Sequence, residues 1–580
     1  MVVAIPLIWI TAIIVLAFTV IAASVFVKIY QDRHDRDAFV TVVCVLSLTS
    51  LLATVCLFPV DIALVSSTTD NATGLKKDWA SPETVAHIIL GLKIVYYLLY
   101  SLDVAMCLLV IPFAYFWYEE WDVDATTSGR IKSAMKYSLC FLMLVIILLV
   151  VGLFLPVAQE TKGHLDLDYF KKLLLENHGE RALTFITGTL LCLGIIPYVF
   201  YTAPGLALTP QLLIRSVRGA SLPSVSASAH QDLLLNRERQ RIIEARYAGG
   251  PSSRFTAKDR RVLEGLQREE RSLVRRQRVA EEGTHGTQKW LGKLQTIGRP
   301  FKILFGILVL LLSISIFVSM LLTSIDKSKN SVCGKSCGYI LAKLNIPNPI
   351  NWLFVTTSRV FPVDYVLALV LVLDLFIASV VGTAFVGIRF LWVSLFQIRP
   401  GHTKPQGLLM ATVMLTLTVL AINYSITMII APQYAHYGGQ KFCNMTPQVL
   451  KTGVYRDCRN HKELIIPCSE SGPQDICTPT VVSTFFNRVT LNFPYFGAFA
   501  FWGQFAFLGV YIVTLLTGLV RPPKLGNRKA EEEDAENDED ENLLAGADRR
   551  VNAAREDIRG QSGGRRDYGT NARARGEDDA

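Results

Sequence analysis

Four ionisable residues, Asp61, Lys93, Asp103 and Asp374, interrupt long apolar stretches of this chain. A charge in such surroundings is costly, so it usually meets a partner, a wet cavity or a transported ion. Asp61 and Lys93 fall toward the same side of neighbouring stretches and could pair, a role that could equally be purely structural. Asp103 and Asp374 fall near the centres of theirs. Facing a common cavity, they could bind a cation or relay a proton; otherwise Ser, Tyr or backbone groups, or a wet crevice, satisfy each one.

Recognisable catalytic motifs are missing from the sequence. It contains no Walker A motif, no HExxH and no GxSxG, and its nine His are scattered. We therefore expect no enzyme and no intrinsic cofactor. Any active transport would need an ion gradient or a partner ATPase.

The elements that must position these residues are nine apolar stretches in a chain that is 51% hydrophobic. A helix needs about 20 mostly apolar residues to cross the bilayer, where lipid cannot satisfy backbone polar groups. We predict an all-α polytopic protein in the lipid bilayer, with nine transmembrane helices at 4–27, 39–63, 89–115, 137–155, 183–201, 303–322, 365–387, 408–430 and 496–520. The first stretch lacks the basic start of a signal peptide, so we expect it to be retained. The net charge of +9 lies in cytosolic-looking segments and does not indicate a nucleic-acid partner.

Cysteines and basic residues predict the orientation. With the N-terminus lumenal and the C-terminus cytosolic, Lys and Arg are more numerous inside. Five cysteines fall within spans, and none lies in the segments 203–302 and 521–580. Disulfides persist in oxidising compartments, so the remaining six are disulfide candidates in lumenal loops: Cys333, Cys337, Cys443, Cys458, Cys468 and Cys477.

The spacing leaves the disulfide connectivity open. The short separation of Cys333 and Cys337 also fits a metal site, but no His lies in that loop, so we expect no metal there. N-glycosylation sequons at Asn71 and Asn444 also fall in predicted lumenal loops. A third sequon, at Asn423, lies within a span and should not be reached.

The chain divides into four predicted regions: a first bundle of five spans (1–202), a cytosolic basic loop (203–302), a second bundle of four spans with the Cys-bearing lumenal loops (303–520), and a tail (521–580). Within the loop, apolar periodicity predicts helices at 232–246 and 256–278, broken at 248–253 by Gly and Pro. This helical hairpin is either a docking surface for a partner or a solvated linker.

The tail is too polar to bury a core, so we predict that it is disordered in the cytosol. After an acidic run, Glu539, Leu543 and Leu544 form an acidic dileucine pattern. Such a pattern is a sorting signal that trafficking adaptors read as a short peptide.

The motif FPVD occurs twice, at 58–61 and 361–364, on the lumenal ends of two spans. Asp364 comes at the start of its span and could cap that helix. Asp61 comes at the end of its span and cannot do so there.

Several longer motifs resemble the limb-region-like membrane protein family, and within it the lysosomal cobalamin transporter branch. They are FPVDIALVS at 58–66, KDW at 77–79, PFAYFWYEE at 112–120, PGLALTP at 204–210, FPVDY at 361–365, RPGHTKP at 399–405 and APQY at 431–434. The resemblance covers most of 4–520. Asp103 and Asp374 are not part of these motifs, which makes a proton relay at those positions less expected.

The resemblance implies a multi-pass protein of the lysosomal or vacuolar membrane that exports cobalamin (vitamin B12) from the lumen to the cytosol. It also implies an ABC transporter of subfamily D as a partner, which would supply the missing ATPase. Two roles stay open: direct transport of cobalamin, and a receptor, adaptor or escort role that stabilises and traffics the partner.

Overall fold

The structure is a computed structural model of the chain. It describes residues 4–32, 35–120, 127–154, 178–219, 222–245, 262–263, 265–267, 270, 273–274, 299–341, 343–358, 360, 362–390, 393–444, 458, 461–470, 472–473 and 475–520. The chain divides into two compact units, one made of Met1–Leu213 with Leu304–Arg521 and the other of Ile214–Ile303 with Pro522–Ala580. The five spans before residue 203 and the four after residue 302 therefore belong to a single unit.

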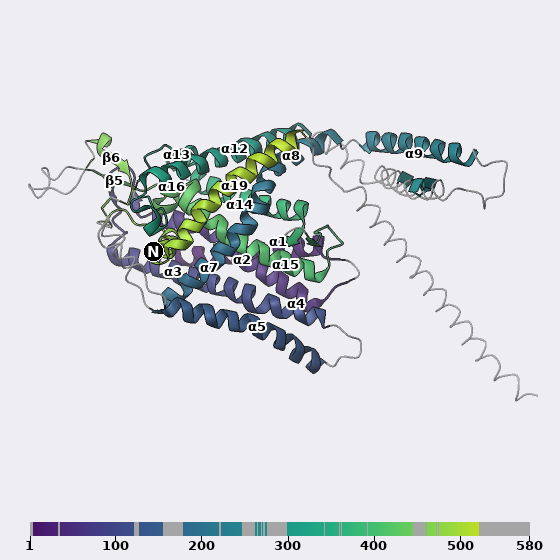
Figure 1. Ribbon diagram of the computed structural model, residues 1–580. Helices are drawn as coiled ribbons and strands as arrows, with labels where there is room; N and C mark the ends of the chain where they lie inside the picture. The colour runs from purple at the N-terminus through teal and green to yellow at the C-terminus, as the bar shows by residue number, and fades with distance from the viewer. Residues whose placement is uncertain are drawn as a thin grey trace, which may run out of the picture. The chain divides into compact units, whose positions relative to one another are not determined.

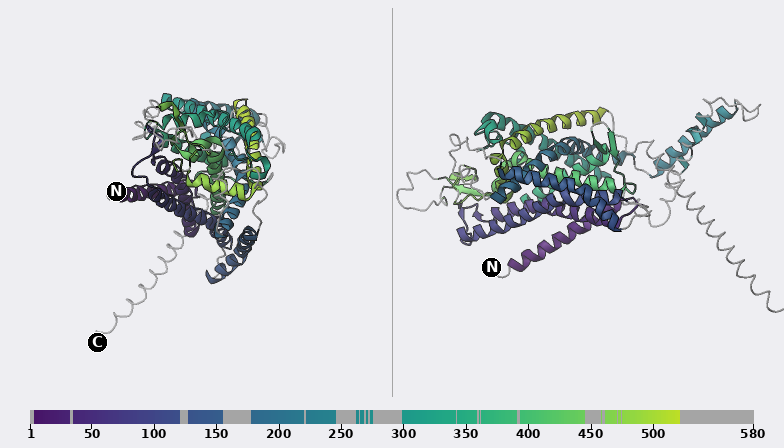
Figure 2. Two further views of the ribbon diagram at one scale, coloured as in Figure 1. Left: turned by 90° about the vertical axis from the view of Figure 1, so that its left-hand side faces the viewer. Right: turned by 60° about the horizontal axis from the view of Figure 1, so that its bottom comes forward.

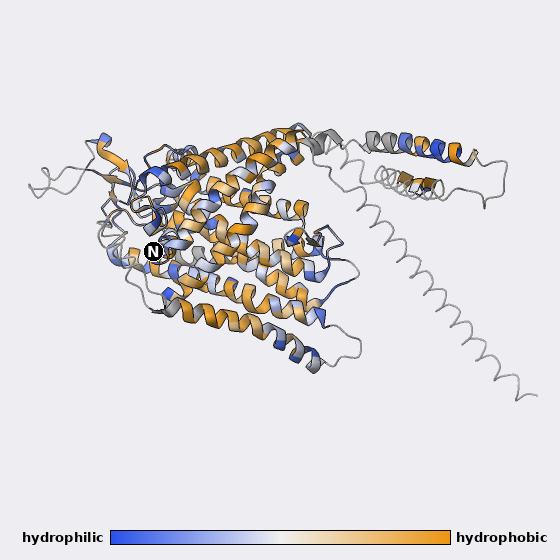
Figure 3. Ribbon diagram, viewed as in Figure 1, coloured by the Kyte–Doolittle hydropathy of each residue, from blue (hydrophilic) through white to orange (hydrophobic). Residues whose placement is uncertain are grey.

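The described residues contain nine helical runs that are long and apolar enough to cross a membrane, as the sequence predicts. Single α-helices form six of them: α1 (Ala4–Tyr30), α2 (Ala38–Ser66), α5 (Thr127–Phe154), α12 (Arg299–Asn330), α14 (Val363–Val386) and α19 (Pro494–Val520). Figure 3 shows these runs apolar along their length, with hydrophilic residues gathered toward their ends.

The other three runs contain a π-helical segment. These are α3 (Pro82–Ala105) with η1 (Met106–Val110) and α4 (Ile111–Glu119), α7 (His178–Pro197) with η3 (Tyr198–Thr202) and α8 (Ala203–Gly219), and α15 (Pro405–Ser425) with η6 (Ile426–Ile430). Such segments interrupt the regular hydrogen-bond ladder and often occur at functional sites.

Shorter elements join the spans. They are the helices η5 (Gly334–Cys337), α13 (Pro349–Thr357), α16 (Pro432–Tyr437), η7 (Lys462–Leu464) and α18 (Val481–Asn492), and three antiparallel pairs, β1 (Thr69–Asp70) with β2 (Leu75–Lys76), β3 (Ile388–Phe390) with β4 (Val393–Phe396), and β5 (Lys441–Cys443) with β6 (Ile465–Pro467). The all-α prediction is confirmed for the spans, and the strands are confined to connections.

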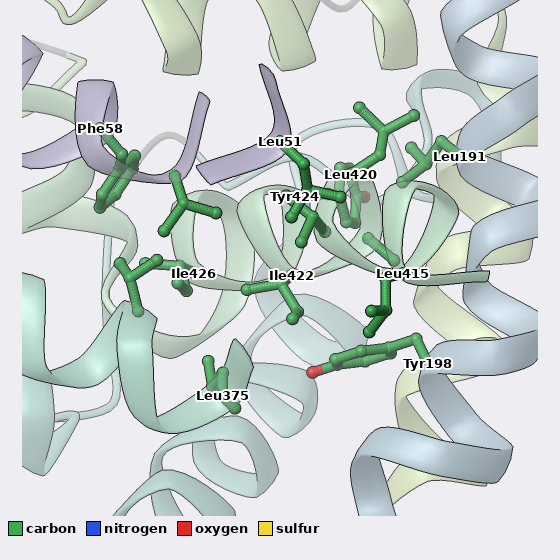
Figure 4. Packing of buried hydrophobic residues seen from close by; sticks show 14 of the residues in the cluster. Leu51, Phe58, Leu191, Tyr198, Leu375, Leu415, Leu420, Ile422, Tyr424 and Ile426 are labelled. Carbon is green, nitrogen blue, oxygen red and sulfur yellow. The ribbon is translucent and has the colours of Figure 1, made fainter. Parts of the chain in front are cut away.

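The core of the bundle surrounds α15. In the span formed by α15 and η6, 78% of the residues in the most apolar 18-residue stretch are buried. The corresponding share for α5 is 6%. This places α15 at the centre of the bundle and α5 at its edge. Figure 4 shows side chains of α15 packed against residues of neighbouring helices, among them Leu51 and Tyr198. The α1 helix also lies at the edge (Figure 2), where residues such as Phe18 face outward, as expected of a lipid-facing surface.

One end of the bundle gathers the features that the sequence analysis assigned to the lumen. The start of α1, the β5–β6 pair and helices α13 and α16 lie at this end (Figure 1). Three disulfides are found there, Cys333–Cys337, Cys443–Cys458 and Cys468–Cys477. We call it the disulfide-bearing end.

At the opposite end, two of the family-like motifs contact residues outside the motifs. Gln31, just after α1, forms a parallel bridge with Thr403 of RPGHTKP. Glu119 of PFAYFWYEE accepts a hydrogen bond from the Gln406 side chain, which joins α4 to α15.

The second unit contains α9 (Leu222–Ala245), which covers the first predicted helix of the hairpin. The residues described between 262 and 274 are helical and lie beside α9. Arg237 donates to Glu270 at 2.7 Å, and Gln240 donates to the Leu266 carbonyl at 3.1 Å. The two segments therefore run antiparallel, as in an αα-hairpin.

Candidate functional site

A polar cavity of about 750 Å³ lies at the disulfide-bearing end. Its wall combines the last turn of α12, the end of η6, the short helix α16, the helix α18 and the loop after β6. Ionisable and amide side chains from four separate segments are on its wall: Lys327, Gln433, His436, Glu470 and Asn487. This size and mixed lining are typical of a small-molecule site.

Lys327 is the unusual member of this set. Its side chain is only 3% exposed, and it lines the cavity. The neighbouring carboxylate, Asp326, is committed elsewhere, because it accepts from Asn330 at 2.6 Å and from the Asn345 backbone N–H at 2.9 Å. Among the described residues, no carboxylate pairs with the Lys327 side chain. Its ammonium group can therefore donate hydrogen bonds to an acceptor on a ligand.

His436, Glu470 and Asn487 form a buried cluster on the same wall. His436 Nδ1 lies 3.0 Å from the Pro432 carbonyl oxygen, an acceptor, so Nδ1 carries the proton. Nε2 is then the acceptor for the Asn487 amide at 2.8 Å and lies 3.3 Å from Glu470 Oε1.

Burial sets the protonation of this cluster. Desolvation lowers the pKa of His436 to about 4, although the hydrogen bond that it donates to the Pro432 carbonyl opposes the shift, and the nearby Lys327 lowers the pKa further. Desolvation raises the pKa of Glu470 to about 8, although its hydrogen bond with Asn487 opposes the shift. Both groups are therefore neutral between these values, so their 3.3 Å contact is not a salt bridge.

Hydrogen bonds between two family-like motifs hold α16 in place. Tyr434, of APQY, donates its hydroxyl to Asp364 Oδ2 at 3.0 Å. Pro362 occupies the N-cap position of α14 with no side-chain cap, and Asp364 lies within the first turn. The Asp364 carboxylate also accepts from backbone N–H groups of this first turn, at Asp364 and Tyr365, so the contact with Tyr434 adds to the expected capping role.

A second cavity of about 630 Å³ adjoins the first, since Tyr437, Glu470 and Gly472 line both. Its wall includes Lys76, which donates to Thr478 at 2.5 Å. Burial lowers the pKa of Lys76 to about 8, against the attraction of Asp475. The Cys468–Cys477 disulfide closes the loop that carries Glu470 between the two cavities.

Asp61 and Lys93 have different partners in the structure. Asp61 is fully buried and accepts from the backbone N–H groups of Val481 and Val482, at 3.3 and 3.0 Å. It therefore caps the N-terminus of α18 from another helix, where free N–H groups favour a carboxylate. Lys93 Nζ lies over the Tyr97 ring, 5.3 Å from its centroid.

Asp103 and Asp374 lie in different surroundings. Asp103 lines a small cavity and accepts from Ser50 at 2.6 Å and Thr54 at 3.1 Å, both on α2. Asp374, on α14, is not among the residues that line that cavity, and its Oδ2 is buried without a hydrogen bond. Asp103 therefore has hydroxyl partners and also lines a cavity, but it does not share that cavity with Asp374.

The predicted modification sites fall partly within the described chain. Asn71 lies in the turn between β1 and β2 and Asn444 directly follows β5, both at the disulfide-bearing end, whereas Asn423 is 1% exposed. Cys333 and Cys337, considered for metal, are joined to each other. Within the described residues, no group of three or more His, Cys, Asp or Glu could hold a metal ion. Glu539, Leu543 and Leu544 lie outside the described residues.

The residues of the large cavity were not singled out from the sequence. Lys327 stands at the end of an apolar stretch and could have been noticed as a basic residue in a span. His436, Glu470 and Asn487 carry no comparable signal, because only the folded loops bring them together.

The nine spans, the outward-facing apolar residues and the polar cavity at one end define a polytopic integral membrane protein. Residues 8–295 match the family model described as LMBR1-like membrane protein. Three curated fungal proteins named "Probable lysosomal cobalamin transporter" are similar to the chain over nearly all of both sequences. The one from Sclerotinia sclerotiorum is 54% identical, covering 96% of this chain and 95% of the relative. Those from Aspergillus terreus (52%, covering 93% and 94%) and Neurospora crassa (50%, covering 96% and 94%) are comparable.

The chain belongs to the LMBR1-like membrane protein family. This agrees with the resemblance of its motifs to the limb-region-like family. No solved structure matches the chain.

Proposed function

We propose that the protein is a lysosomal cobalamin transporter, which moves or helps to move cobalamin from the lysosomal lumen to the cytosol. The observation that carries the proposal is the similarity, at 50–54% identity over almost the whole chain, to proteins with that name. Transport is also consistent with nine spans and with a sequence that lacks known catalytic motifs.

The cavity lined by Lys327 is the proposed entry site. Cobalamin carries amide groups and a phosphodiester, which need donors, acceptors and a positive charge. The wall offers the amides of Gln433 and Asn487 and the Lys327 side chain, which has no carboxylate partner among the residues that the structure describes. The adjoining second cavity gives room for a bulky ligand. In the proposed orientation the disulfide-bearing end faces the lumen, where cobalamin is released.

The test is uptake of radiolabelled cobalamin into proteoliposomes that hold only the purified full-length chain, with and without a pH gradient. Saturable uptake is the expected result, and Lys327→Gln should reduce it at least tenfold by removing the charge. Lys302→Gln, an exposed lysine at the other end of the same helix, is the matched control and should leave uptake unchanged. No uptake by a folded, correctly oriented preparation would exclude autonomous transport.

We further propose that an ABC transporter of subfamily D supplies ATP-driven energy where a gradient does not. The support is the family resemblance together with the missing Walker A motif. The hairpin of α9 and 262–274 is the proposed docking element. Replacing 222–278 with a Gly/Ser linker should abolish co-purification with the ABC transporter, and retention of the complex would remove the hairpin from the proposal.

We propose that localisation to the lysosome depends on trafficking adaptors that bind the sorting signal at Glu539, Leu543 and Leu544. Changing Leu543→Ala and Leu544→Ala together should move the protein from lysosomes to the cell surface, as seen by fluorescence microscopy. Unchanged localisation would mean that another segment carries the signal.

A further inference from the structure

A third and much smaller cavity lies within the membrane-spanning part of the bundle. Its volume is about 30 Å³, room for one water molecule or one small ion. Six polar side chains from α2, α3, α7 and α15 line it: Thr54, Tyr100, Asp103, Thr187, Thr416 and Asn423. All lie well inside their spans, so the cavity belongs neither to the large cavity nor to its loops.

Asp103 supplies the only carboxylate among the lining residues. Each of its oxygens accepts one hydrogen bond, from Ser50 and from Thr54, and each has a further lone pair for another partner. Among the described residues no basic side chain pairs with Asp103. A carboxylate inside a membrane protein needs such compensation.

Two further oxygens on this cavity lack partners. Within the described part of the chain, the Tyr100 hydroxyl and Asn423 Oδ1 are buried without a hydrogen bond, and their residues are only 3% and 1% exposed. Buried polar atoms are rarely left unpaired, so these two point to something bound between them. An amide oxygen can only accept, and it therefore needs a donor or a cation.

We propose that this cavity is a binding site for one monovalent cation, Na⁺, held by Asp103, Tyr100 and Asn423 with the surrounding threonine hydroxyls. The set consists of hard oxygen donors with one negative charge, which suits a hard monovalent cation. A water molecule would satisfy Asn423 but leave the Asp103 charge uncompensated. Because one ligand is a carboxylate, an oxygen of high field strength, we expect the site to bind Na⁺ more tightly than the larger K⁺.

The position of the site suggests what binding would do. Residues of four helices line the site, and so does Cys107 of the π-helical segment η1, where the regular hydrogen bonding of the helix is interrupted. A bound ion would therefore stabilise the packing of these helices against one another. A sodium gradient could then drive transport; this consequence alone rests on the proposed function, whereas the site itself does not.

The test is thermal unfolding of the purified full-length chain in nanodiscs, without cobalamin, while NaCl replaces choline chloride at constant ionic strength. KCl forms a third series. A bound ion stabilises the folded state by mass action, so the unfolding temperature should rise saturably with Na⁺ and much less with K⁺. Asp103→Asn should weaken the apparent Na⁺ affinity at least tenfold, and Tyr100→Phe, which removes one oxygen and keeps the ring, several-fold.

Asp374→Asn is the matched control, because it neutralises another intramembrane carboxylate that does not line the cavity. It should keep the full sodium response. Equal unfolding temperatures in the three salts, or a sodium response that survives in Asp103→Asn, would overturn the proposal and leave a water site. If Asp103→Asn does not fold, Tyr100→Phe decides in the same assay. Failure of cobalamin uptake would not affect this result.

Discussion

At the scale of single residues, burial controls the chemistry of the large cavity. His436 and Glu470 lie 3.3 Å apart, a distance that suggests a salt bridge. Desolvation nevertheless moves their pKa values in opposite directions, to about 4 and about 8, so that both lose their charge. Lys327 is the buried basic side chain on the same cavity wall.

Glu470 should make the stability of the protein depend on pH. Its pKa is raised in the folded state from 4.5 to about 8, so the unfolded chain releases this proton first as the pH rises. Stability from this group is full below pH 4.5 and falls as the pH approaches 8, by up to about 1.4 kcal/mol per pH unit. Glu470→Gln cannot ionise and should flatten the stability profile in this window, as measured by thermal unfolding.

The matched control is Glu463→Gln, whose side chain is 83% exposed. It should keep the wild-type pH profile.

The depressed pKa of His436 has the opposite effect on stability. The contribution of neutral His436 to the stability of the folded state is lost as the pH falls from 6.5 through about 4. A Glu470→Gln protein that still loses stability between pH 5 and 8 would contradict the assignment.

Asp61 is a second residue whose role depends on burial. Both of its oxygens accept from the start of α18, and an amide could offer only one acceptor there. Asp61→Asn should therefore destabilise the protein by about 2 kcal/mol in thermal or denaturant unfolding.

Asp37 provides the comparison for Asp61. It caps α2 in the ordinary way with a single oxygen, Oδ1, on the Phe39 and Val40 N–H groups. Asn caps as well as Asp at such positions, so Asp37→Asn should be nearly neutral. Equal effects of the two substitutions would mean that Asp61 is an ordinary cap.

The sequence identified Asp61 as important but could not give its partner. The partners Val481 and Val482 lie about 420 positions away in the chain, on a helix too short to be recognised as a span. Similarly, the intramembrane position of Asp103 suggested a cavity, whereas its hydroxyl partners on α2 follow only from the packing of helices. A charged residue within an apolar stretch can be recognised from the sequence alone. The residues that it contacts cannot, because they depend on the tertiary structure.

At the scale of elements, the spans were predictable because the bilayer imposes length and composition on each helix separately. The π-helical segments and the short buried helices α16 and α18 were not, because packing and capping by other elements determine them. The strand pairs next to the spans are likewise too short to show an alternating pattern.

The close approach of η3 and the start of α8 to α14 depends on two glycines. A Cβ on Gly205 would overlap the Ala378 carbonyl oxygen, and a Cβ on Gly382 would overlap that of Tyr201. The obstacles are backbone atoms, which cannot rotate away. Gly205→Ala should destabilise the protein by about 3 kcal/mol or separate the helices, as measured by thermal unfolding in detergent.

Gly91 is the matched control for this prediction. It lies inside α3, and a Cβ there would meet nothing within 4 Å. Gly91→Ala should be neutral or stabilising by up to about 1 kcal/mol, since Ala is the better helix former. A tolerated Gly205→Ala would show that the two helices can move apart without loss.

At the scale of the whole molecule, the two groups of spans separated by the loop 203–302 form one unit. The sequence could not show this, because hydropathy identifies each span but not its neighbours. Contacts such as the hydrogen bond from Tyr198 to Ser425 join the first group to the second. Deletion of either group would therefore expose a packed interface rather than release an independent domain.

The orientation of this unit in the membrane leads to the last prediction. Asn71 and Asn444 lie at the disulfide-bearing end, so both should carry N-glycans if that end is lumenal. Asn71→Gln and Asn444→Gln should each remove one glycan, seen as a mobility shift that glycosidase treatment abolishes. Gly401→Asn creates the sequon Asn-His-Thr at the opposite end, where a positive φ of 79° is compatible with Asn. It should stay unmodified, because glycosyl transfer occurs only in the lumen. A glycan at position 401, with none at the two natural sites, would reverse the topology and place the large cavity on the cytosolic face.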